Sequence, residues 1–85
     1  MFNDIAYDNL DELMDLMERA GLPKVTDETW HNNITPSVST TIGKDFYEVF
    51  VPDNDEVYTY LIWDEEEGVG EFDDPRDVVD FLKKL

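Results

Sequence analysis

Hydrophobic and polar positions repeat along this chain with two different periods. Between residues 9 and 20, apolar side chains return at every third or fourth position, which predicts one buried face of an α-helix: Leu10, Leu13, Met14, Met17 and Ala20. Asp8 or Asn9 is expected to cap the start of this helix. Gly21 and then Pro23 are expected to end it. The pattern allows one or two further turns before Asp8.

Further along the chain the period shortens to two, which predicts β-strands. Residues 36–42 and 45–51 alternate in this way, and residues 56–63 do so most clearly. The Pro-Asp-Asn-Asp tetrapeptide at 52–55 has turn chemistry, so the second and third strands are expected to form an antiparallel hairpin. After another turn, residues 69–72 return as a short fourth strand.

The remaining segments complete the expected fold. Residues 25–33 have no clear period; Thr26 could open a short helical turn, with Trp30 packed beneath it as an anchor. Asp74 and Pro75 predict the start of a last helix, with this buried stripe: Val78, Phe81 or Leu82, and Leu85. The fold class is therefore α+β, an N-terminal helix, an antiparallel three- to four-stranded meander and a C-terminal helix. Both helices are expected to pack on one face of the sheet, leaving the other face open to solvent.

Composition adds an unusual charge to this fold. The chain has 85 residues, 41% of them hydrophobic, and a formal net charge of −16. That length and apolar content predict one compact, folded domain over residues 1–85. Residues 45–74 contain twelve acids and no base, together with seven aromatic residues. The acidic excess is therefore expected to be built onto strands and turns, and not onto a disordered tail.

The charge restricts the partners. Duplex nucleic acid and anionic membrane surfaces would repel this protein, so the expected partner is a basic protein, in particular a DNA- or RNA-binding enzyme. Residues 1–10 have no signal-peptide pattern, and no apolar run approaches the roughly 20 residues that span a bilayer. A cytoplasmic protein is expected, in the host cytoplasm if a phage encodes it, either as a monomer or as a homodimer.

Catalytic and metal-binding chemistry is poorly supported. The single histidine, His31, has no nucleophile near it in the sequence, and Ser37 and Ser39 lack a nucleophile-elbow pattern. Asp53 and Asp55 begin like an EF-hand loop, but the glycine and the later ligands do not follow. The sequence predicts no enzyme, no cofactor and no dedicated metal site, and it leaves weak divalent-cation binding open.

Two groups of acids are the candidate partner-binding residues. The first group is spaced by four and three residues, so on one helix it falls within an arc of about 80° and steps about 5 Å along the axis: Asp4, Asp8, Asp11, Asp15 and Glu18. The second group occupies the two predicted turns: Asp53, Asp55, Glu56, Asp64, Glu65, Glu66 and Glu67. An ordinary solvent-facing helix and charged turns that protect sheet edges are the alternative interpretations.

In size, charge and lack of catalytic residues, the chain is similar to several small acidic inhibitors that have unrelated folds. These are phage uracil-DNA glycosylase inhibitors, anti-restriction and anti-CRISPR DNA mimics, and nuclease immunity proteins. This likeness implies an inhibitor that mimics DNA, or blocks the basic DNA-binding groove of a nucleic-acid enzyme. It carries over no site residue. The alternative is a non-enzymatic acidic adaptor, or an immunity-type domain, that docks a partner through its open sheet face.

Overall fold

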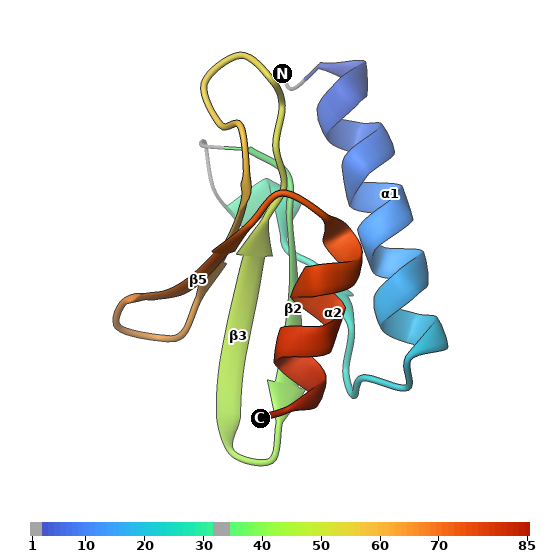
Figure 1. The fold of residues 1–85 in the computed structure, drawn as a ribbon. Coiled ribbons are helices and arrows are strands. Elements are labelled where there is room, and N and C mark those ends of the chain that lie inside the picture. Colours follow the sequence, from blue (N-terminus) through green and yellow to red (C-terminus); the bar gives the residue numbers. More distant parts are fainter. Residues whose placement is uncertain (1–2, 32–34) are drawn as a thin grey trace.

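A computed structural model describes residues 3–31 and 35–85 of the chain. In this part, two α-helices lie on one face of a five-stranded antiparallel sheet with the strand order β1-β2-β3-β4-β5 (Figure 1). The predicted α+β class is confirmed. The elements in chain order are α1 (Asp4–Arg19), β1 (Thr26–Asp27), the 3₁₀ turn η1 (Thr29–His31), β2 (Ser37–Ile42), β3 (Asp45–Phe50), β4 (Tyr60–Trp63), β5 (Gly68–Phe72) and α2 (Pro75–Lys83).

Helix α1 begins earlier than its apolar stripe alone indicates. Asn3 is the N-cap, and its side-chain oxygen accepts a hydrogen bond from the Ala6 amide at 2.8 Å. The prediction that Asp8 or Asn9 would cap the helix is therefore wrong, because both residues lie within it. The side-chain amide of Asn9 instead donates to the Pro52 carbonyl oxygen at 2.8 Å, which ties the helix to a distant loop.

The other helix ends follow the predicted signals. Gly21 follows α1 with a φ of +79°, the left-handed conformation that glycine adopts without strain. Asp74 caps α2, accepting from the Arg76 amide at 2.9 Å, and Pro75 is the first helical residue. Leu85 does not join the buried stripe: it is 52% exposed, because α2 ends before it. No helix of the described residues is long and apolar enough to cross a membrane.

Three of the predicted strands lie close to their expected positions, and the chain also forms a short strand that was not expected. Strand β4 starts four residues later than predicted, at Tyr60, because residues 53–57 fold into a loop around the Asp53 carboxylate. Residues Thr26–Asp27 pair with β2 as an edge strand, where the sequence suggested the start of a helical turn; the 3₁₀ turn η1 begins at Thr29 instead. Trp30 is not a packed anchor, since it is 82% exposed.

The core fills the space between the helices and one face of the sheet. Val49 of β3 and Ile62 of β4 are paired across the strands and are fully buried on this face. Their neighbours Phe50 and Leu61 are also paired and point to the opposite face, since successive side chains alternate along a strand. The core cluster consists of Leu10, Leu13, Met17, Val38, Val49, Val51, Tyr60, Ile62, Val78, Val79 and Leu82.

Candidate docking surfaces

The first candidate surface is the outer side of α1. Because the helix extends back to Asp4, the spacing of its acids applies over the whole stripe, and all five residues are exposed. The opposite side of α1 is held on the core by Ala6, Leu10, Leu13 and Met17. We call this surface the α1 stripe; it consists of Asp4, Asp8, Asp11, Asp15 and Glu18.

One cation lies at the end of the α1 stripe. The Arg19 guanidinium contacts the Asp15 carboxylate at 3.0 Å, and both side chains are more than half exposed. Exposed pairs of this kind contribute little to stability, at most about 1 kcal/mol. The pair therefore reduces the negative charge at the C-terminal end of the stripe and leaves its N-terminal part strongly anionic.

The loop between β3 and β4 lies beside the N-terminal half of α1. The Asn3 side chain donates to the Asp53 carbonyl oxygen at 2.9 Å, and Asn9 makes the bond to Pro52 described above. The structure thus brings the first predicted turn next to the N-terminal half of α1, through residues that do not belong to the α1 stripe. Asp55 and Glu56 are exposed in this loop. They add two acidic side chains to the surface near the start of the helix.

Asp53 differs from these neighbours because its carboxylate organises the loop. Its Oδ1 accepts hydrogen bonds from the amides of Asp55, Glu56 and Val57 at 3.0, 3.0 and 2.9 Å. Chiefly the Val57 and Asp55 amides hold the pKa of the Asp53 carboxyl below its ordinary value. The residue is only 9% exposed. Its carboxylate therefore contributes more to the loop than to the outer surface.

The second predicted turn, residues 64–67, lies away from α1 at the tip of the β4–β5 hairpin (Figure 1). The acids of the first predicted turn and those of the second therefore do not form one continuous surface (Figure 1). Asp64 Oδ1 accepts from the amides of Glu66 and Glu67 at 2.7 and 2.8 Å, and the Glu67 and Glu66 amides keep the pKa of Asp64 low. Glu65, Glu66 and Glu67 are exposed.

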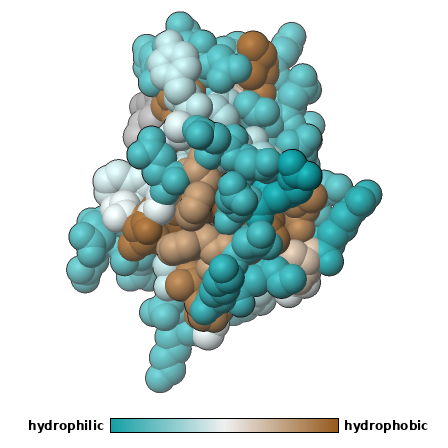
Figure 2. Space-filling view, in the orientation of Figure 1, coloured by the Kyte–Doolittle hydropathy of each residue, from teal (hydrophilic) through white to brown (hydrophobic). Residues whose placement is uncertain are grey.

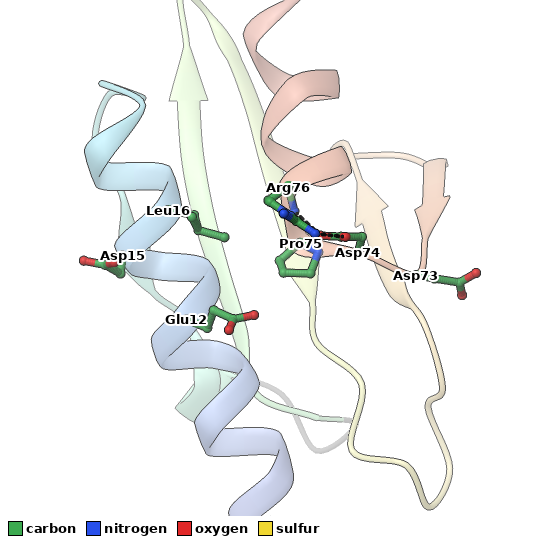
Figure 3. A pocket seen from close by; sticks show the side chains of 7 residues that line it. All are labelled: Glu12, Asp15, Leu16, Asp73, Asp74, Pro75 and Arg76. Atoms are coloured by element: carbon green, nitrogen blue, oxygen red, sulfur yellow. Dashed lines mark hydrogen bonds and ion pairs between the residues drawn. The ribbon is translucent and has the colours of Figure 1, made fainter.

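An acidic cleft that the sequence did not reveal lies between α1 and the start of α2. Its volume is about 540 Å³, and Figure 3 shows Glu12 directed toward α2, whereas Asp15 points away. Arg76 lies in the cleft and contacts the Asp74 carboxylate at 2.9 Å. Burial, with smaller contributions from Glu12 and Asp74, raises the pKa of Tyr60 to about 12.

The face of the sheet opposite the helices is a further surface, and its centre is apolar. Phe50 of β3 and Leu61 of β4 lie side by side, and Trp63, two residues after Leu61, is 43% exposed. With Glu48 and Asp64 they line a shallow hollow of about 300 Å³. We call this surface the open face. Its signal in the sequence was the period of two along β3, which places Phe46, Glu48 and Phe50 on the side of the sheet opposite the buried Val49.

A further exposed aromatic residue, Tyr58, lies in the loop before β4. Tyr58 is 65% exposed and its hydroxyl donates to the Asp55 carbonyl oxygen at 2.6 Å, whereas Tyr60 is buried. Figure 2 shows the helix-bearing side of the molecule, where hydrophilic side chains predominate and hydrophobic groups appear between them.

Comparison with protein-family models, with curated protein sequences and with solved structures finds no match to this chain. Among residues 3–31 and 35–85, no group of three or more His, Asp or Glu side chains is arranged to hold a metal ion.

Proposed function

We propose that this protein is a non-enzymatic, cytoplasmic inhibitor that occupies the basic nucleic-acid-binding groove of a partner protein. The observation that carries this proposal is the α1 stripe, a line of exposed carboxylates along a continuous helix. From Asp4 to Glu18 the helix rises about 21 Å, with successive carboxylates about 5 Å apart. One DNA strand carries phosphates about 3.4 Å apart along its axis, so the two spacings are comparable but not equal.

Electrostatics would supply the first step of binding. A net charge of −16 attracts a basic groove over about a Debye length, so the on-rate is fast at low salt and falls as salt rises. Asp55 and Glu56 are exposed in the loop beside the N-terminal half of α1, and their charges add to this attraction. The inhibition is then steric, because DNA and this protein compete for the same basic side chains.

The proposal is tested by capture and competition. The tagged protein is incubated at low salt with a lysate of the organism that carries its gene, and bound proteins are eluted with duplex DNA. Recovery of a basic nucleic-acid enzyme, whose DNA binding the purified protein then inhibits competitively and with steep salt dependence, is the expected result. A complex that is insensitive to salt and leaves DNA bound would contradict the proposal.

Charge-reversal variants test whether binding depends on the carboxylates of the α1 stripe or only on the net charge of the protein. Replacing Asp8, Asp11 and Asp15 with lysine raises the net charge from −16 to −10. Even about 1 kcal/mol for each reversed contact would weaken binding roughly 100-fold. The matched control reverses three exposed acids outside the candidate surfaces, Asp45, Asp77 and Asp80. Equal losses in the two variants would mean that net charge alone acts, and that the stripe has no special place in binding.

The open face favours a second candidate function, an acidic adaptor that docks a protein through its sheet. The observation in its favour is the apolar group of the half-buried Phe50 and Leu61 and the exposed Trp63, which an inhibitor acting only through carboxylates does not need. Under this function, reversal of the α1 stripe leaves partner binding nearly intact. Substitution of Trp63 then removes it.

A further inference from the structure

We propose that the open face binds an extended protein segment that presents arginine and apolar side chains together on one of its sides. The inference rests on the second function above, docking through the sheet, and not on the carboxylates of α1. It identifies the chemistry of the occupant. The shape of the face, the acids around it and the net charge of the protein together select this occupant.

The floor of the face is apolar and belongs to three adjacent strands. Phe50 and Leu61 are register partners, and the Trp63 side chain lies beside Gly68 of β5: a Cβ added at Gly68 would lie 3.5 Å from the Trp63 ring. A second shallow hollow, of about 370 Å³, continues from Leu61 and Trp63 to Gly68, Gly70 and Glu71. Apolar side chains of a bound segment would cover this floor and remove it from water.

Carboxylates stand at fixed places around this floor. Glu48 is the register partner of Trp63, and its Oε2 accepts from the Ser37 hydroxyl at 2.7 Å. Glu71 is the register partner of Leu61, and its Oε2 accepts from the Thr59 hydroxyl at 2.7 Å. These hydrogen bonds orient the two acids before a partner arrives, which lowers the entropy that binding must remove.

Arginine fits this arrangement better than lysine does. A planar guanidinium can stack on the exposed Trp63 ring and direct its N–H groups to the Glu48 carboxylate on the neighbouring strand. A lysine ammonium offers a single charge without the planar surface that stacks on the ring. In an extended segment every second side chain points to the same side, so arginine and apolar residues two positions apart would reach the rim and the floor together.

The net charge excludes the other occupants of such a face. A second copy of this chain, also at −16, would bring the same acids together without counter-charges, and an anionic membrane or a nucleic acid would be repelled. A purely apolar segment would leave the carboxylates at the rim desolvated without a partner. A segment with both positive charge and apolar side chains satisfies the floor and the rim together.

The inference is tested by titrating the isotope-labelled protein with a blocked octapeptide of two Arg-Ser-Val-Ser repeats, whose arginine and valine side chains share one side of the extended chain. We expect amide shifts on β3, β4 and β5 and a shift of the Trp63 indole N–H, assigned with a Trp30→Phe variant. A peptide with glutamate in place of arginine, and one with serine in place of valine, are expected to bind at least about tenfold more weakly. Equal binding of the arginine–serine peptide, or shifts confined to α1 and residues 53–56, would overturn the inference.

Substitutions locate the binding energy. Trp63→Ala and Glu48→Gln are each expected to raise the dissociation constant of the arginine–valine peptide about tenfold. Tyr58→Ala, which removes an exposed aromatic side chain outside the open face, is expected to leave it unchanged. The amide spectrum of each free variant establishes that it is folded, and Glu48→Gln keeps the side-chain volume. An unchanged dissociation constant in both Trp63→Ala and Glu48→Gln would refute the proposed site.

The α1 variant distinguishes this inference from the inhibitor function. Reversal of Asp8, Asp11 and Asp15 is expected to weaken the peptide only about twofold, through the change in long-range charge, and to leave the pattern of shifts in place. Loss of the peptide in that variant would mean that it binds the α1 stripe. That result would reject the open-face site and leave the inhibitor proposal standing.

Discussion

Replacing Asp53 with alanine is expected to destabilise the fold, although it removes one negative charge from a protein of net charge −16. Three backbone amides donate to one oxygen of this nearly buried carboxylate. A hydrogen bond to a charged group contributes about 1.5–3 kcal/mol, but three donors share one oxygen and the loop borders solvent. We therefore expect a total loss of about 2–3 kcal/mol, well below three times the single-bond value.

Two further variants separate the hydrogen bonds from the charge. Asp64→Ala removes the same charge from an exposed turn, where the carboxylate accepts hydrogen bonds from two backbone amides, and it is expected to destabilise the fold less. Asp53→Asn keeps a neutral acceptor and is expected to lose about half of what alanine loses, because charge-assisted bonds are about twice as strong as neutral ones. Both alanine variants relieve charge repulsion, so the difference between their free energies of unfolding measures how much more the hydrogen bonds of Asp53 contribute to stability than those of Asp64.

Urea unfolding at low and at high salt is the assay, with thermal melting as a second readout. For a domain of this size, a loss of 2–3 kcal/mol lowers the melting temperature by roughly 10–20 °C. Because its pKa is lowered in the folded state, Asp53 stabilises the protein above its ordinary pKa of 3.8, and that stabilisation is lost as the pH falls through the folded value. The deficit of Asp53→Ala should then shrink in acid. An Asp53→Ala protein as stable as Asp64→Ala would refute the reasoning.

Three other predictions concern stability. The free energy of unfolding should fall by about 2 kcal/mol between pH 10 and pH 12, because Tyr60 of the folded protein stays protonated up to a pKa of about 12, whereas in the unfolded chain it ionises near 10. Tyr60→Phe should remove this fall in urea unfolding at alkaline pH. The melting temperature should rise as NaCl is added, and a flat salt profile would show that the charges are compensated. Gly70→Ala should be less stable than Gly68→Ala in urea unfolding, since its added Cβ would lie 3.1 Å from Phe72 Cε2, whereas at Gly68 the nearest atom is 3.5 Å away; equal stabilities would contradict this.

The elements with a long apolar period could be predicted from the sequence, and those held by single polar contacts could not. The spacing of the buried apolar residues of α1 and the Asp74-Pro75 start of α2 were sufficient to predict both helices. The start of α1 depends on Asn3, and the start of β4 depends on the amides that converge on Asp53. These side chains act on backbone groups in ways that hydrophobic spacing does not record.

The candidate surfaces follow the same division. The exposed positions of the α1 acids come directly from helical geometry, so that surface could be predicted. The cleft between Glu12 and Arg76 could not, because it depends on how two helices from opposite ends of the chain pack. The prediction for Trp30 was wrong: this aromatic residue was expected to pack beneath a helical turn as an anchor, and it is exposed.

The acidic residues of the chain fall into two sets, according to whether their carboxylates accept hydrogen bonds from backbone amides of the chain itself. Asp53, Asp64 and Asp74 each accept hydrogen bonds from backbone amides two to four residues later, and a turn or helix start needs such a residue whatever the protein binds. The exposed acids beside them are not required in this way, and neither is the α1 stripe. Substitution of the first set should therefore change stability more than partner binding. Substitution of the exposed set should change partner binding and leave the fold intact, which is the pattern that a recognition surface requires and a solubility coat does not.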